Sequence, residues 1–314
     1  MVKKQIFGDT LKAQLQANAR DRIELFLLAD GSVRGAILEG TKLVNEMRAN
    51  HELGVLETLI LGHAYIGALL MSSNVKGQDR LVLEITCDGP AKGVSVEATA
   101  YGEVRGFLKT EAIPLEQPLE SFNMSPFFGR GVLSVTKILE KADHPYSGEI
   151  ELEYGNIAED LANFHVRSEQ VPSAFNISVK FNADGEVAGA GGLIVQALPG
   201  SDPGVLAELE RVVAGFASIG EQFAQRRPID SLYLDAFADY DPVSLGHRRV
   251  EFMCHCNRSR FARFVEHLPA SDRLDIMQNG PFPLVLRCHN CNTCYSFDRE
   301  ELASITDPSG ATKP

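Results

Sequence analysis

Five of the six cysteines lie near the C-terminal end of the chain, and their spacing limits what that region can fold into. The segment "MCHCN" holds one pair, and "CHNCNTC" holds three more cysteines within seven residues. The region also has few large apolar side chains, and a unit that small usually needs a metal or a disulfide to fold. Metal binding or redox chemistry is the expected use of these thiols, because permanent disulfides are rare in a reducing cytosol.

A structural zinc site fits this spacing, since two close cysteine pairs from separate segments can place four thiolates around the ion at about 2.3 Å. Cys254 and Cys256 are the first pair, and the second comes from the triplet of Cys288, Cys291 and Cys294. The spacing alone leaves open which two of the three bind. The sequence therefore predicts a zinc-binding unit near the end of the chain.

Other uses of these residues are less well supported by the pattern. An iron–sulfur run would need a fourth cysteine followed by proline, and neither follows Cys294. His255 and His289 could compete as ligands, but each stands between two cysteines and would point away from a site that those cysteines share, so both are expected to be exposed. Cys87, at the end of a predicted strand, is interpreted as a small apolar core residue.

Residues 1–200 carry repeated strand and turn patterns, which predict an α+β domain with antiparallel sheets. Segments such as "RLVLEITC" and "GVSVEATA" alternate, and Asp184-Gly185 lies between two apolar runs as in a hairpin. Helical patterns occur at about 40–71 and 156–168. The apolar stretch 59–71 contains a histidine and is shorter than the roughly 18 residues of a membrane span, so it predicts a buried helix.

Two glycine-rich segments, "FGRG" and "AGAGG", do not form phosphate-binding loops, because neither is followed by lysine and serine or threonine. The second leads into a strand-like run, "LIVQAL". Glycines in such a position are expected to relax a bulge or a bend in the strand.

Residues 201–249 are interpreted as a helical linker that can be docked or released, followed by the C-terminal unit over 250–314 with a disordered tail. A stripe of apolar residues recurs at helical spacing between 205 and 226, and it consists of Leu206, Leu209, Val213, Phe216, Ile219 and Phe223. Gly215 and Gly220 lie inside this predicted helix, and each costs about 1 kcal/mol relative to alanine. The helix should therefore depend on tertiary cover.

The formal net charge of −12 disfavours binding to nucleic acid or to an anionic membrane. A cluster of arginines around the first cysteine pair leaves one alternative, a zinc-ribbon protein that binds nucleic acid, and it consists of Arg248, Arg249, Arg258, Arg260 and Arg263. The first residues, "MVKKQIFGDTLKAQ", have no apolar core long enough for a secretory signal. A cytoplasmic location is therefore expected.

The chain resembles the heat shock protein 33 family of redox-regulated chaperones over nearly its whole length. Segments in the family's order include "CDGPAKGVSVEA", "AGAGGLIVQALPG" and "YDPVSLGHRRVEFMCHCNRSR". The family carries C-x-C, a long spacer, C-x-x-C and then an aromatic pair, which here are Cys254, Cys256, Cys288, Cys291, Tyr295 and Phe297. Its tyrosine normally comes four residues after the last ligand, so the resemblance selects Cys288 and Cys291 and makes Cys294 an addition.

The resemblance implies a chaperone that is not an enzyme and uses no ATP. Zinc would hold four thiolates in the reduced, inactive state; oxidation would release it and form the disulfides Cys254–Cys256 and Cys288–Cys291. The C-terminal unit would then unfold, the linker would lose its cover, and apolar surface would bind unfolding client proteins. The implied partners are these clients and a second copy of the oxidised form, without nucleic acid or membrane.

Cys294 has three readings. It could exchange with its neighbours and form a Cys291–Cys294 disulfide in a loop of the same size as Cys288–Cys291. It could be a reactive thiol beside the zinc site, stabilised by basic neighbours. It could also be a bystander at the start of the strand before Phe297.

Overall fold

The structure is a computed structural model that describes residues 1–4, 21–115 and 121–306. The chain divides into two compact units, a larger one of Lys4–Phe252 and a smaller one that joins Met1–Lys3 to Met253–Pro314. The tail expected at the C-terminal end falls outside the described residues. The predicted α+β class is confirmed, and the expected linker region, 201–249, lies within the larger unit.

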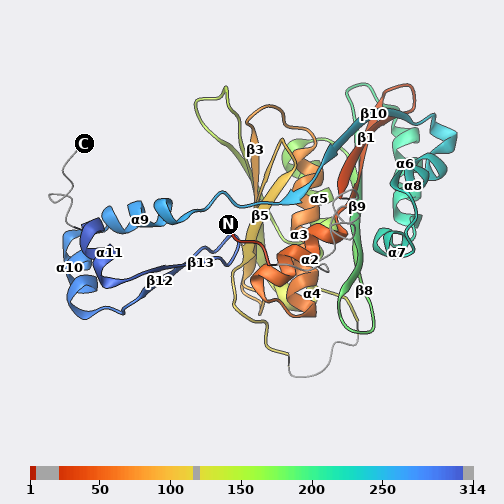
Figure 1. The fold of residues 1–314 in the computed structure, drawn as a ribbon. Helices are drawn as coiled ribbons and strands as arrows, with labels where there is room; N and C mark the ends of the chain where they lie inside the picture. The colour runs from red at the N-terminus through yellow and green to blue at the C-terminus, as the bar shows by residue number, and fades with distance from the viewer. Residues whose placement is uncertain (5–20, 116–120, 307–314) are drawn as a thin grey trace. The chain divides into compact units, whose positions relative to one another are not determined.

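Two sheets form the larger unit, as Figure 1 shows. The first has five antiparallel strands in the spatial order β10 (Val243–Arg249), β1 (Arg22–Leu28), β2 (Val33–Glu39), β9 (Val187–Ala197) and β8 (Ser173–Phe181). The second has six in the order β11 (Glu251–Phe252), β5 (Glu103–Leu108), β4 (Gly93–Thr99), β3 (Arg80–Cys87), β6 (Gly131–Ile138) and β7 (Tyr146–Glu151). Strand β11 runs parallel to β5, and the other pairs are antiparallel as predicted.

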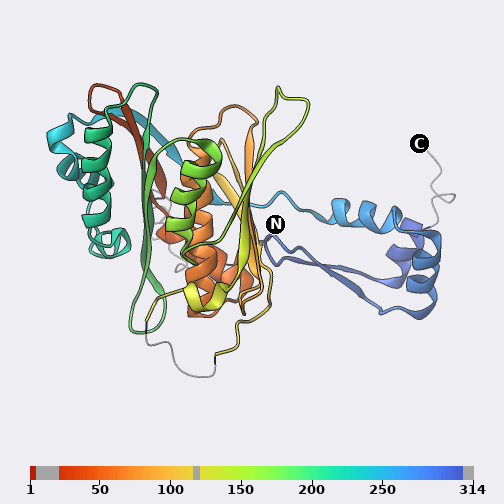
Figure 2. The same cartoon turned by 180° about the vertical axis from the view of Figure 1, so that it is seen from behind.

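Helix α3 (Val55–Ser72) lies between the two sheets, as the opposite views of Figures 1 and 2 show. It is apolar and long enough to cross a membrane by length and composition, but 94% of it is buried inside the larger unit. Tyr65 is fully buried on it, and its hydroxyl donates a hydrogen bond to the Gly106 carbonyl at 2.9 Å. The predicted buried helix is thus the centre of a folded core.

Helices α2 (Thr41–His51) and α5 (Ile157–Phe164) pack on α3, and α5 continues into the π-helical turn η1 (His165–Glu169). The short helix α4 (Ser125–Phe128) precedes β6. The predicted hairpin at Asp184-Gly185 joins β8 to β9, and Gly185 has the positive φ of +73° that this turn requires.

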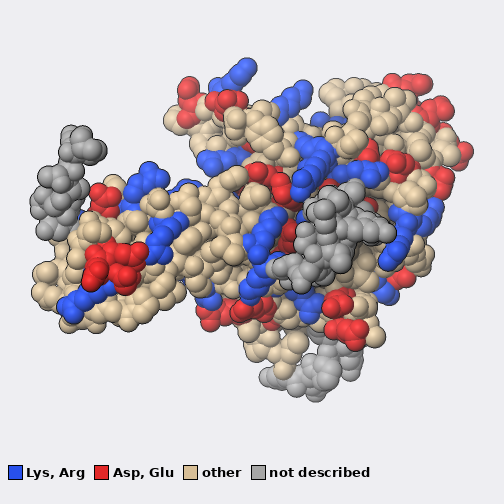
Figure 3. All heavy atoms as spheres, viewed as in Figure 1, with Lys and Arg blue, Asp and Glu red and all other residues tan. Residues whose placement is uncertain are grey.

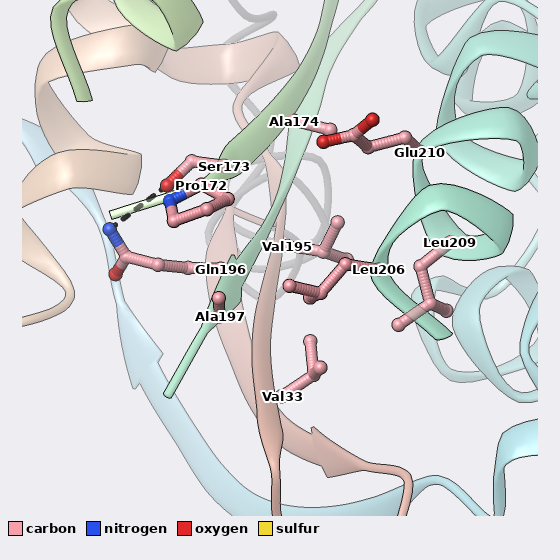
Figure 4. Close-up of a pocket in the computed structure, with 10 residues that line it drawn as sticks. All are labelled: Val33, Pro172, Ser173, Ala174, Val195, Gln196, Ala197, Leu206, Leu209 and Glu210. Atoms are coloured by element: carbon pink, nitrogen blue, oxygen red, sulfur yellow. Dashed lines mark hydrogen bonds between the residues drawn. The ribbon is translucent and has the colours of Figure 1, made fainter. Parts of the chain in front are cut away.

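Three helices cover the other face of the five-stranded sheet: α6 (Pro203–Gly215), α7 (Ile219–Ala224) and α8 (Ile229–Ala236), followed by the short turn η2 (Ala238–Tyr240). We call α6, α7 and α8 the linker helices. Sheet and linker helices share one apolar cluster, made of Phe26, Leu28, Val33, Ile37, Leu193 and Val195 from the strands with Leu209, Val213, Ile219, Phe223, Ile229, Leu232, Tyr233 and Phe237. Figure 4 shows α6 directing Leu206 and Leu209 toward the strands over a cavity of about 10 Å³, room for about one water.

The prediction of one helix over 205–226 is wrong, because the chain breaks between α6 and α7. Gly215 ends α6, Phe216 adopts an extended backbone with ψ of 124°, and the Ser218 hydroxyl caps α7 by accepting the Glu221 N–H at 3.3 Å. Glycine is a poor helix former and serine is a favoured N-cap residue, so Gly215 and Ser218 favour this break over a continuous helix. The apolar stripe nevertheless faces the sheet in both segments.

The glycine-rich stretch of β9 contains the expected bulge, where the pairing with Lys180 and Phe181 shifts register. Gly189 has a second role that the sequence did not indicate. A Cβ atom placed there would lie 2.1 Å from the carbonyl oxygen of Gly220 and 2.5 Å from the backbone nitrogen of Ala224. Only glycine at this position therefore lets the backbone of α7 approach the strand so closely.

Buried Asp21 begins helix α2 by accepting hydrogen bonds from the backbone N–H groups of Lys42 at 3.2 Å and Leu43 at 2.5 Å. Burial raises the pKa of this carboxyl to about 7, with these two hydrogen bonds opposing the shift and Glu39 adding to it. An unfolded aspartate titrates near 4, so between about pH 4 and 7 the folded state holds a proton that the unfolded state has lost. Stability should therefore fall as the pH rises through that window.

We expect Asp21→Asn to flatten this pH dependence, because the amide cannot ionise. Urea unfolding of the larger unit at several pH values between 4 and 7.5 measures this dependence. In the unmodified chain the free energy of unfolding should differ by a few kcal/mol between the lowest and the highest pH. Asp184→Asn, in the exposed hairpin turn, is the matched control and should leave the slope unchanged. Equal slopes for Asp21→Asn and the unmodified chain would contradict the assignment.

The smaller unit consists of a two-stranded antiparallel hairpin, β12 (Leu284–Arg287) with β13 (Cys294–Phe297), and three helices, α9 (Arg258–Glu266), α10 (Ala270–Asn279) and α11 (Arg299–Thr306). The segments "PLVLRCHNC" and "CYSF" resemble two strands that meet at the cysteines, and the pairing of β12 with β13 confirms this prediction. Its cluster has three fully buried apolar residues, Val265, Phe297 and Leu302, with partly buried side chains around them. The core is as thin as the sequence predicts.

Residue periodicity in this region predicts an inward-facing Phe264 on a helix, a cap by Ser271 on a second short helix and a strand over "VEFMCHC", and all three predictions are wrong. Phe264 is 60% exposed, because a narrow stripe of α9 through Phe261 and Val265 suffices for its contact with the core of the smaller unit. Ser271 does not cap α10, which begins one residue earlier after Pro269, a residue whose φ is fixed for that place. The strand expected over "VEFMCHC" is limited to the two residues of β11.

Candidate metal centre

Four cysteines of the smaller unit form one buried group. The Sγ atoms of Cys254, Cys256, Cys288 and Cys291 all lie within 4.8 Å of one another. Cys254 and Cys288 are 3.8 Å apart, and Cys256 and Cys291 are 3.3 Å apart. The first pair comes from the segment after β11, and the second from the loop between β12 and β13. The fold thus brings together two segments that the spacer separates in sequence.

The donor set fits a tetrahedral thiolate-bound metal. Ligands at about 2.3 Å from a zinc ion are about 3.8 Å from each other, which is close to the sulfur separations found here. Soft thiolates without carboxylate oxygens favour zinc or an iron–sulfur centre over magnesium or calcium. The four cysteines could therefore hold one metal ion without rearrangement of the backbone.

Backbone hydrogen bonds shape the loop that presents the second pair. The Cys288 carbonyl accepts the N–H groups of Cys291 at 3.3 Å and Asn292 at 2.7 Å, and the Cys288 N–H donates to the Thr293 carbonyl at 2.9 Å. Asn292 has a positive φ of 56°, a conformation that asparagine tolerates better than most residues. This tight turn is why two residues between the cysteines suffice to direct both sulfurs inward.

Side-chain hydroxyl groups contact one sulfur of each pair. The Tyr295 hydroxyl lies 3.2 Å from Cys256 Sγ and donates to the Cys256 carbonyl at 3.0 Å. The Thr293 hydroxyl lies 3.3 Å from Cys291 Sγ. The sequence pattern marked Tyr295 but not this contact, and its only signal was the alternation in β13 that places Tyr295 and Phe297 on one face.

Three of the buried thiols shift one another's pKa values. Hydrogen bonds from Cys288 and Cys291 lower the pKa of Cys254 well below its ordinary value. The pKa of Cys288 is raised in return, because its thiol hydrogen-bonds Cys254, and the same partner raises the pKa of Cys291 to about 11. Further deprotonation therefore needs a positive charge, which a divalent metal ion supplies.

The remaining candidates lie apart from this group. Cys294 is exposed at the start of β13, and its Sγ contacts the Asn292 carbonyl at 3.8 Å. His255 and His289 are exposed, as expected. Cys87 is buried at the end of β3 in the larger unit, and burial raises the pKa of its thiol.

The arginines near the first cysteine pair divide between the two units, with Arg248 and Arg249 in the larger one and the other three in the smaller one. Arg248 is half-buried in the larger unit and donates to the Ala100 carbonyl. Arg258 makes a two-pronged ion pair with Glu301 at 2.6 Å and lies over the Phe297 ring. On the face shown in Figure 3, basic side chains are interspersed with acidic ones. These arginines therefore serve the fold more than a polyanion interface.

Comparison with known proteins gives a consistent set of relatives. A family model described as Hsp33 protein matches residues 21–298. The 33 kDa chaperonin of Symbiobacterium thermophilum is 32% identical over 88% of this chain and 94% of the relative, and that of Lachnoclostridium phytofermentans is 31% identical over 88% and 95%. The crystal structure of the 33 kDa chaperonin from Thermotoga maritima is similar with a TM-score of 0.82 and 30% identity, covering 91% of this chain and 98% of that one.

Proposed function

The chain belongs to the Hsp33 family of chaperones, and from this premise we propose that it is a redox-regulated holdase that needs no ATP. It is inactive when reduced and zinc-bound, and oxidation activates it to hold unfolding proteins under oxidative stress. The names of its relatives describe chaperones, which suggests a role that is not enzymatic. The cytoplasm is the proposed location, because a reducing compartment keeps the thiols reduced until stress.

One observation carries the proposal: four buried thiols form a single group inside a unit with three fully buried apolar residues. Zinc is the proposed ion, bound by Cys254, Cys256, Cys288 and Cys291, and when bound it supplies the positive charge that lets all four exist as thiolates. Since so thin a core provides little hydrophobic stabilisation, the fold of the smaller unit should depend on these thiolates remaining reduced.

Oxidation removes the donors by ordinary thiol chemistry. One thiolate attacks a peroxide oxygen, so that an S–O bond forms, the O–O bond breaks and hydroxide leaves; a second thiolate then attacks that sulfur and expels another hydroxide. Two thiolates thus lose two electrons to one peroxide. We propose Cys254–Cys256 and Cys288–Cys291 as the products. In the folded unit Cys256 is 3.3 Å from Cys291, but once the unit loosens, neighbours in sequence meet most often.

The link to the linker helices runs along the chain. Phe252, two residues before Cys254, is fully buried in the larger unit, where its ring centroid lies 6.1 Å from that of Tyr65. Strand β10 precedes it and pairs with β1 beside the linker helices. We propose that unfolding of the smaller unit frees β11 and β10 in turn, and that the linker helices then leave the apolar cluster beneath them.

The proposed partners are unfolding client proteins, which would bind the apolar residues that the linker helices now cover. A homodimer of the oxidised form is also proposed, since exposed apolar surface favours self-association. Neither nucleic acid nor membrane is a proposed partner, because the net charge of −12 opposes both. The zinc-ribbon alternative draws no support from the relatives, whose names all describe chaperonins.

Client aggregation tests the function. A chemically denatured enzyme is diluted into buffer with the reduced or the oxidised protein, light scattering follows aggregation, and a metallochromic dye follows zinc release. We expect suppression only by the oxidised protein, with one zinc released per chain. Equal suppression by both forms would refute the switch, a coloured protein with iron would favour the cluster alternative, and tight RNA or DNA binding at moderate salt would favour the zinc ribbon.

Hydrogen exchange across the same transition tests the linker. Amides of the linker helices should be protected in the reduced protein and should exchange at least tenfold faster after oxidation, because short helices need tertiary cover. Helix α3 is the internal control and should stay protected, since it lies between two sheets. Unchanged exchange in α6 and α7 would contradict the release.

Cys294 stays outside the proposed ligand set. Peptide mapping of the oxidised protein separates its three readings: a Cys291–Cys294 bond indicates exchange, and a modified Cys294 indicates a reactive thiol. A free Cys294, together with unchanged activation kinetics in Cys294→Ala, indicates a bystander.

A further inference from the structure

The four thiols of the cluster have different hydrogen-bond partners. Those of Cys288 are the thiols of Cys254 and Cys291. Cys256, by contrast, lies 3.2 Å from the hydroxyl of Tyr295, a neutral oxygen donor. When all four cysteines are thiolates, the thiol donors are gone, but this phenol still has a proton to donate.

The geometry leaves that proton available for sulfur. The Cys256 carbonyl, the other acceptor within reach of the phenol at 3.0 Å, already accepts a hydrogen bond from the Met1 nitrogen at 2.7 Å. A phenol has one proton, and a thiolate is a stronger acceptor for it than a neutral carbonyl, because bonds to charged acceptors are the stronger ones.

Packing holds the phenol in place. Its ring packs against Phe261 of α9 with the centroids 4.9 Å apart and the planes tilted by 31°, and β13 pairs Tyr295 with Leu286 of β12. Both neighbours belong to the apolar cluster of the smaller unit. The hydroxyl is therefore fixed by the same core that oxidation is proposed to dissolve.

We propose that Tyr295 is a positioning residue that restrains the reactivity of Cys256, so that this sulfur reacts more slowly than that of Cys288 while the smaller unit is folded. A hydrogen bond to a thiolate sulfur stabilises its negative charge and so lowers its nucleophilicity toward a peroxide or another electrophile. The inference deepens the proposed function, because it assigns the redox centre an internal restraint that is lost when the core around Tyr295 opens.

The test measures nucleophilicity cysteine by cysteine in the zinc-loaded full chain. A brief pulse of iodoacetamide, in which an S–C bond forms and iodide leaves, is followed by unfolding and a heavy-isotope reagent, so that mass spectrometry gives the fraction of each cysteine that reacted. Tyr295→Phe removes the hydroxyl and keeps the packed ring. The reaction rate of Cys256 relative to Cys288 should rise roughly fivefold to tenfold.

Tyr146→Phe is the matched control, since Tyr146 is 62% exposed on β7 of the larger unit, and it should leave all rates unchanged. A merely structural role for Tyr295 predicts a parallel rise at all four cysteines, and that result, like an unchanged ratio, would overturn the proposal. If Tyr295→Phe loses zinc, the unmodified chain decides: Cys256 must react more slowly than Cys288, and equal or faster reaction refutes the restraint. Alkylation rates do not depend on chaperone activity, so failure here is separate from failure of the client assay.

Discussion

Serine in place of any one of Cys254, Cys256, Cys288 and Cys291 should abolish tight zinc binding and unfold the smaller unit while the larger unit stays folded. Thiolate–zinc binding in small modules is worth about 10–16 kcal/mol, and this binding energy is folding energy when no preformed site exists without the metal. The three fully buried side chains of the unit offer about 1.5–3 kcal/mol each, which cannot replace it. Zinc content by atomic spectroscopy and hydrogen exchange over α9 to α11 measure the two effects.

Two substitutions at other cysteines are the controls. Cys87→Ser lies in the larger unit and should retain the full zinc content. Cys294→Ser should also retain it, because Cys294 lies outside the buried group of four. Full zinc affinity in Cys288→Ser would show that Cys294 can take its place, and it would refute the assignment of Cys288 and Cys291 as the second pair.

Gly189→Val should activate the chaperone without any oxidant. A Cβ atom at Gly189 would lie 2.1 Å from the Gly220 carbonyl oxygen, so that α7 cannot stay docked, whereas valine suits the strand itself. The cysteines are untouched, and the reduced variant should keep its zinc. Client aggregation under reducing conditions should be suppressed to nearly the level of the oxidised unmodified chain. Zinc content and protection of α3 in hydrogen exchange verify that the rest of the molecule is intact.

Gly215→Ala is the opposite control for the same helices. A Cβ atom there meets nothing within 4 Å, and alanine stabilises a helix by roughly 0.5–1 kcal/mol relative to glycine, so the reduced variant should stay inactive. A Gly189→Val protein that exposes the linker helices in hydrogen exchange and yet holds no client would refute the apolar cluster beneath them as the client-binding surface.

Features encoded in neighbouring residues could be predicted from the sequence. The alternation in "RLVLEITC" and its partners specified antiparallel strands, and the cysteine spacing marked the segments that meet in the buried group. Features that depend on residues distant in sequence could not. From the sequence, Gly220 is expected only to weaken a helix, and the structure shows that its backbone packs closely on Gly189 of β9. The Tyr295 hydroxyl reaches Cys256 only because β13 packs on α9.

The position of α3 between two sheets affects how fast the protein can return from the oxidised, active form to the reduced, inactive form. Its core, which includes Tyr65, is complete without the linker helices, so their departure removes an outer layer and leaves a folded platform. To return, these short segments only have to form helices again and dock on a sheet that is already folded. Helix formation takes about a microsecond or less. Thiol–disulfide exchange takes seconds to hours. Recovery after stress should therefore follow the supply of reductant and not the refolding of the chain.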